Sequence, residues 1–150
     1  MNPSLETDLD RIVRSIWSSL LGLDIRRVAS DDTGVSPGRN LIASVRFDGS
    51  RRAALILKCP APLARRAAGI MFGAAPEAIP IEDVEDALGE LANITGGHVK
   101  SLLPGGGRSS LPVMAIIEDD ADRPRLCARD ALCQVEFDCE GHPFLVAVLR

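Results

Sequence analysis

The residues best suited to act together chemically lie in the stretch 80–104. Asp86, Glu90, Asn93 and Gly97 follow one another at steps of four, three and four residues. An α-helix turns about 100° per residue, so these positions fall within roughly 60° of one line. The row would present two carboxylates, an amide that both donates and accepts hydrogen bonds, and one position without a side chain. The missing side chain would let another surface come close to the helix.

The element that must position this row is a helix between Pro80 and Pro104, because proline is tolerated where a helix begins and not in its interior. Glu82 and Asp83 lie in the first turn and Lys100 near the end, as the helix dipole favours. Apolar residues recur on the opposite face at steps of three and four, which predicts a buried stripe. The stripe consists of Val84, Ala87, Leu88, Leu91, Thr95, Val99 and Leu102.

Spacing alone leaves two interpretations of the polar row open. Polar residues opposite an apolar stripe are expected on any surface helix, where they are simply solvated. The glycines of this stretch favour the other interpretation, in which the face contacts another surface. Gly89, Gly96 and Gly97 each cost about 0.5–1 kcal/mol relative to alanine inside a helix. A helix with three of them would exchange stability for close approach by another surface.

Composition limits the classes of function. A chain of 150 residues favours one domain, spanning 1–150. One Trp, four Phe and no Tyr predict an aliphatic core and offer few platforms for stacking nucleic-acid bases. The net charge of −4 also argues against a nucleic-acid partner. Neither a long apolar run nor an export signal is evident, which predicts a cytoplasmic protein without a membrane contact.

Enzyme and metal-site motifs are weak. The four cysteines form no CxxC pair and the two histidines are far apart in sequence, so we expect buried, reduced thiols and no metal site. The glycines at 105–107 lack the Lys-Ser/Thr of a phosphate-binding loop and predict a turn. We find no convincing set of nucleophile, base and orienting residue, and expect no cofactor of the protein's own. The row on the central helix is the remaining candidate.

The N-terminal segment predicts an amphipathic helix over Ser4–Leu21, with Ser4 as the N-cap and Gly22 after its end. Its apolar face includes Trp17, which would pack in the core or, alternatively, contact another subunit. A short strand is expected at 25–29. Alternating apolar residues then predict a β-hairpin with strands at 41–47 and 53–57 and a tight turn at Asp48-Gly49.

The rest of the chain adds a short helix at 63–72, ended by Gly73, and strands at 111–118, 125–131, 132–139 and 143–149. Glu140-Gly141 provides turn residues between the last two. Strands grouped before and after a pair of helices predict an α+β fold, in which a long central helix and further helices pack on a mostly antiparallel sheet.

The octapeptide Asp86-Ala-Leu-Gly-Glu90-Leu-Ala-Asn93 resembles the motif of the CheC/CheX family of chemotaxis phosphatases, specifically the CheX-like domain. The family pattern is an acidic residue or serine, three residues, glutamate, two residues and asparagine, with a downstream proline that opens a strand. Here Ile-Thr-Gly-Gly follows the octapeptide and Ser110-Leu111-Pro112 provides the proline. The order of helices and strands is also similar, so the resemblance spans nearly the whole chain and implies a CheC/CheX-like fold.

The resemblance implies hydrolysis of the aspartyl phosphate on a CheY-like response-regulator receiver domain. Asn93 would orient the attacking water and Glu90 would pair with the active-site lysine of the receiver. Asp86 matches the first motif position and would have a supporting role, as would Gly97. The receiver would supply Mg²⁺ and the phosphorylated aspartate. A single motif suits the CheX-like type, which is associated with homodimers built through the sheet.

Two alternatives to a phosphatase stay open at this point. The chain could be a non-catalytic receiver-binding or signalling interaction module of the same fold. It could also be a structural or sensory domain in which the helix serves packing alone.

Overall fold

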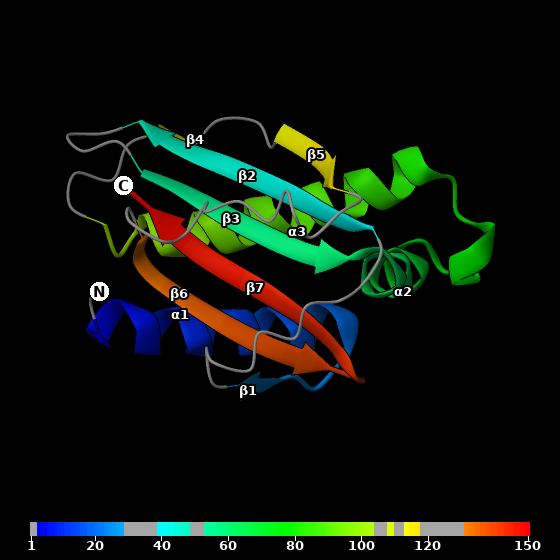
Figure 1. Ribbon diagram of the computed structural model, residues 1–150, viewed down its shortest axis with the longest axis horizontal. Coiled ribbons are helices and arrows are strands. Elements are labelled where there is room, and N and C mark those ends of the chain that lie inside the picture. Colours follow the sequence, from blue (N-terminus) through cyan, green and yellow to red (C-terminus); the bar gives the residue numbers. More distant parts are fainter. Residues whose placement is uncertain (1–2, 29–38, 49–52, 104–107, 110–112, 118–130) are drawn as a thin grey trace.

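The computed structural model describes residues 3–28, 39–48, 53–103, 108–109, 113–117 and 131–150. Within these ranges the chain forms three α-helices and a sheet of seven strands (Figure 1). The helices are α1 (Pro3–Ile16), α2 (Ala61–Phe72) and α3 (Ile81–Lys100). The strands are β1 (Arg26–Val28), β2 (Asn40–Asp48), β3 (Ala53–Pro60), β4 (Arg108–Ser109), β5 (Val113–Ile117), β6 (Ala131–Cys139) and β7 (His142–Leu149).

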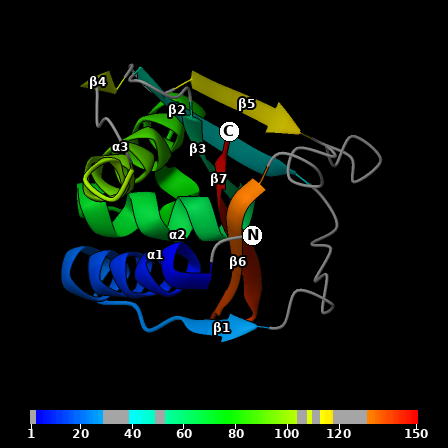
Figure 2. The same ribbon diagram turned by 90° about the vertical axis from the view of Figure 1, so that its left-hand side faces the viewer.

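The sheet is antiparallel throughout, in the order β1-β6-β7-β3-β2, and both β4 and β5 pair with the outer edge of β2. All three α-helices lie on one side of it (Figure 2). The fold is therefore α+β, as predicted. The predicted hairpin is formed by β2 and β3, in which Asn40 pairs with Pro60 and Phe47 with Ala53. Its turn falls outside the described residues.

The core lies between the helices and the face of the sheet that they cover. Successive strand residues point to opposite faces, so every second residue of the central hairpin enters the core. These residues are Leu41, Ala43, Val45 and Phe47 on β2, and Ala53, Leu55, Leu57 and Cys59 on β3. Burial of a leucine or phenylalanine side chain contributes about 1.5–3 kcal/mol, so this face holds the helix layer firmly.

Two predicted chain reversals are confirmed by backbone angles. Gly73 ends α2 in the left-handed region, with φ 66°. Glu140 and Gly141 join β6 to β7 with φ of 51° and 85°, the two positive values that a tight hairpin turn requires.

The first helical segment ends at Leu21 before Gly22, as predicted, but its start and the geometry of its last turn differ from the prediction. It begins at Pro3, so Ser4 lies inside the first turn and is not the N-cap. It also continues into a π-helical turn, Trp17–Leu21, before Gly22. Trp17 is only 1% exposed and its ring stacks on Phe144 with 4.4 Å between centroids. The tryptophan therefore belongs to the core, and the alternative of a subunit contact through it is wrong.

The C-terminal strands are confirmed in part. The expected strand at 111–118 is β5, and those at 132–139 and 143–149 are β6 and β7. Of the strand expected at 125–131 only Ala131 is described, as the first residue of β6. The glycine turn at 105–107 and Cys127 lie outside the described residues.

The three described cysteines are unpaired and buried. Burial raises the pKa of the Cys133 and Cys139 thiols to about 11, and that of Cys59 further still. Thiols of this kind are poor nucleophiles near neutral pH, because the thiolate is the reactive form. The described residues contain no cluster of His, Cys, Asp and Glu suited to hold a metal ion. No helix among them is long and apolar enough to cross a membrane.

Candidate functional site

Helix α3 is fixed by one buried face. The predicted stripe is confirmed for six of its seven members, which are Val84, Ala87, Leu88, Leu91, Thr95 and Val99. The seventh, Leu102, is 40% exposed. The helix ends at Lys100, so the helical progression of about 100° per residue no longer applies at Leu102.

The four predicted site residues lie together on the opposite face of α3. Asp86, Glu90, Asn93 and Gly97 are all exposed. The side chains of Asp86, Glu90 and Asn93 make no hydrogen bond or ion pair with any residue that the structure describes. The row therefore combines a rigid helix with polar groups that remain available to a partner.

The start of α3 is held by an arginine of α2. The Arg65 Nη1 donates to the backbone oxygen of Ile79 at 2.8 Å and to that of Pro76 at 3.4 Å. Both acceptors belong to the connector that leads into α3, and Ile79 is itself 5% exposed. The sequence alone gives no sign of this role, because nothing local signals a contact across fourteen residues. The next residue, Arg66, forms an ion pair with Glu140 at 2.9 Å.

The neighbouring glycines of α3 serve different purposes. A Cβ on Gly96 would lie 3.4 Å from side-chain atoms of Val45 and Phe47, so this glycine lets β2 pack directly on the helix. Gly89 is buried as well. The predicted close approach is therefore confirmed at Gly96, where the approaching surface is β2 of the same chain. A Cβ on Gly97 would have no described atom within 4 Å, which leaves this glycine open to a partner.

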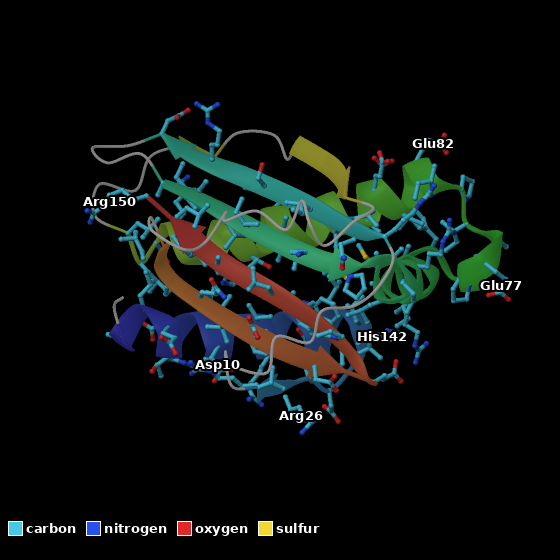
Figure 3. The ribbon with its side chains drawn as sticks, viewed as in Figure 1. Asp10, Arg26, Glu77, Glu82, His142 and Arg150 are labelled. Carbon is cyan, nitrogen blue, oxygen red and sulfur yellow. The ribbon has the colours of Figure 1, made fainter. Side chains whose placement is uncertain are left out.

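The charge of the row is strongly negative toward the start of α3. Glu82, Asp83 and Glu85 precede the row, and Glu82 projects outward from the first turn (Figure 3). Glu90 and Asn93 are three residues apart, so their Cβ atoms are about 5–6 Å apart on adjacent turns. The pair can thus bind a cation at the carboxylate and hold a polar group or a water at the amide at the same time.

The row lies within a segment of the chain that matches a known protein family. Residues 41–126 match the family model described as chemotaxis phosphatase CheX, a segment that begins at β2 and includes all of α3. No curated protein matches the chain.

Solved structures show the same fold over almost the whole chain. The CheX protein of Vibrio vulnificus has a TM-score of 0.76 at 15% identity, covering 97% of this chain and 95% of its own. A CheX–CheY–BeF3–Mg²⁺ complex from Borrelia burgdorferi gives 0.65 at 12% identity, with 95% of each chain covered. Thermotoga maritima FliY gives 0.60 at 19% identity, covering 98% of this chain and 90% of that chain.

Proposed function

The chain belongs to the chemotaxis phosphatase CheX family, and on that premise we propose that it hydrolyses the aspartyl phosphate of a CheY-like receiver domain. Asn93 orients the attacking water, and Glu90 pairs with the active-site lysine of the receiver. Asp86 supports docking one turn earlier, and Gly97 leaves room for the receiver's loops. The receiver supplies Mg²⁺ and the phosphorylated aspartate, and the reaction takes place in the cytoplasm.

The observation that carries this proposal is that Glu90 and Asn93 are exposed on a helix whose other face is buried, and that neither has a partner in the part of the chain that the structure describes. Both residues lie inside the matched family segment. Phosphoryl transfer depends on positioning and electrostatics more than on covalent help from the protein. A firmly packed helix suits that requirement, since its backbone does not need to reorganise when a partner docks.

The two side chains suit different tasks. The Asn93 amide can donate to and accept from a single water, and it carries no charge that would repel the phosphoryl oxygens. The Glu90 carboxylate would be repelled by a phosphoryl group unless it met a cation, which the receiver's lysine provides. An acceleration of about 100-fold corresponds to roughly 2.7 kcal/mol of barrier lowering. One oriented water can account for an effect of that size.

The CheX–CheY complex among the structures of similar fold supports a receiver domain as the partner of this chain too. The test is the decay of a phosphorylated CheY-like receiver, alone and with wild-type protein, Glu90→Ala or Asn93→Ala. We expect wild type to accelerate the decay and both variants to lose most of the acceleration. Glu77→Ala is the control, because Glu77 is exposed in the connector before α3 and outside the row.

The outcomes separate the alternatives. A wild-type protein that binds the receiver without accelerating decay would be a non-catalytic interaction module. Acceleration that survives Asn93→Ala would refute the role of the amide. A homodimer built through the sheet stays a prediction, and a strict monomer in size-exclusion chromatography with light scattering would remove it.

A further inference from the structure

The outer face of α3 continues beyond Asn93 to a cation. Lys100 follows Asn93 by seven residues, which places it about 20° from the line of the amide and about 10 Å further along the helix. Gly97 lies between them and has no side chain, and no atom of the described residues lies within 4 Å of where its Cβ would be. A bare stretch of helix surface therefore separates the amide from the ammonium group.

The charge of α3 changes sign along this face. Its first three turns carry five carboxylates, at Glu82, Asp83, Glu85, Asp86 and Glu90. Lys100 is the single lysine or arginine of the helix. It is half-buried and forms no ion pair with the part of the chain that the structure describes. A partner that lies along the row thus meets carboxylates at one end and a cation at the other.

We propose that Lys100 is a specificity-determining contact of the same site, in which its ammonium group pairs with an anionic side chain on the receiver loop that lies over Gly97. This inference rests on the proposed function. With Glu90 at the receiver's lysine and Asn93 at the phosphoryl group, the next groups along α3 are the open backbone at Gly97 and then Lys100. The receiver must therefore offer a cation followed by an anion in that order, and a receiver with a basic loop at this position is rejected by repulsion.

The test compares Lys100→Glu, Lys100→Gln and Lys100→Arg in the full chain. Steady-state dephosphorylation is measured at increasing concentrations of the phosphorylated receiver. We expect Lys100→Glu to raise KM about 10-fold, because charge reversal converts attraction into repulsion across the interface. Lys100→Gln should raise KM by a smaller factor, and the KM of Lys100→Arg should stay near that of wild type. In all three variants kcat should change less than about twofold. High salt should reduce the difference in KM between wild type and Lys100→Glu, because salt screens the interaction between exposed charges.

The control for net charge is Arg26→Glu, which makes the same change of charge on β1 and also breaks an exposed ion pair with Asp138, a contact of little worth to stability. This strand forms the sheet edge opposite β4 and β5, and Arg26 lies at the far side of the molecule from the start of α3 (Figure 3). A cation near a helix C-terminus also stabilises the helix. A purely structural role for Lys100 would thus lower the melting temperature of Lys100→Glu and leave its KM unchanged, which would overturn the inference.

A binding measurement separates this inference from the proposed function. The probe is a CheY-like receiver carrying beryllofluoride at its phosphorylation-site aspartate, with Mg²⁺. Weaker binding of Lys100→Glu than of wild type supports the contact even if wild type fails to hydrolyse the phosphorylated receiver. Equal binding of the two proteins overturns the contact even if hydrolysis is observed, and absence of binding by wild type overturns both proposals.

Discussion

Helices α1 and α3 both bury an apolar face and expose a polar one, yet their polar faces differ. On α1 the charges are paired within the chain. Arg11 pairs with Asp8, Arg14 with Asp10 at 2.6 Å, and Glu6 with Arg27 of β1. On α3 the carboxylates and Asn93 have no such partners among the described residues.

This difference teaches that amphipathic periodicity alone does not identify a working surface. Exposed ion pairs such as those of α1 each contribute about 0–1 kcal/mol and satisfy charges that would otherwise attract other molecules. The row of α3 keeps a net negative charge and an amide without a partner among the described residues, both on a helix with one buried face. Under the proposed function α1 serves packing and α3 serves partner recognition, and the following changes test that division.

The largest expected effect is on the π-helical turn Trp17–Leu21 that continues α1, because its tryptophan is buried in the core. Trp17→Ala removes a ring that stacks on Phe144 and is almost fully buried. We expect it to lower the free energy of unfolding by about 3–5 kcal/mol. Urea denaturation measures this, and Asn93→Ala in the same assay should lose less than about 0.5 kcal/mol. Comparable losses in the two variants would contradict the division between the helices.

The next effect comes from neutralising one carboxylate on each helix. Glu90→Gln should raise KM for the phosphorylated receiver about 30-fold, equivalent to roughly 2 kcal/mol, because it leaves the receiver's lysine without its charged partner. Asp10→Asn breaks the pair with Arg14 and should cost about 0.2–1 kcal/mol of stability with no change in KM. A KM that responds equally to both variants would show that net charge alone attracts the receiver.

The smallest effect concerns two helix glycines. Gly97→Ala should raise stability by about 0.5–1 kcal/mol, since alanine is the better helix former and the Cβ meets open space. It should also raise KM several-fold by placing a methyl group where the receiver's loop approaches. Gly69→Ala should lower stability by about 1 kcal/mol or more, because its Cβ would lie 2.8 Å from the backbone oxygen of Ala74. A Gly97→Ala protein with unchanged KM would indicate that the receiver does not use this opening.

Much of the site could be predicted from sequence because it depends on one helix. The register of α3 follows from local periodicity, which correctly placed Asp86, Glu90, Asn93 and Gly97 on the exposed face. The β2–β3 hairpin is likewise local, with alternating residues and a short connection.

The remaining features depend on contacts between distant parts of the chain. Gly96 is needed because β2 crosses it, with Val45 and Phe47 about fifty residues earlier in sequence. Trp17 is buried because Phe144 lies against it, and Arg65 acts on a connector that only the fold brings into reach. Local patterns carry no information about such partners. For the same reason the sequence could not predict that the charges of α1 are paired while those of α3 have no ion-pair partner among the described residues.

The central claim is that the Asn93 amide orients the attacking water, and the turnover number of Asn93→Ala tests it most directly. The measurement uses saturating phosphorylated receiver, so that docking through Glu90 does not limit the rate. We predict a fall in kcat of about 100-fold, with KM within a few-fold of wild type and an unchanged melting temperature. An Asn93→Ala protein that turns over at the wild-type rate would contradict the account.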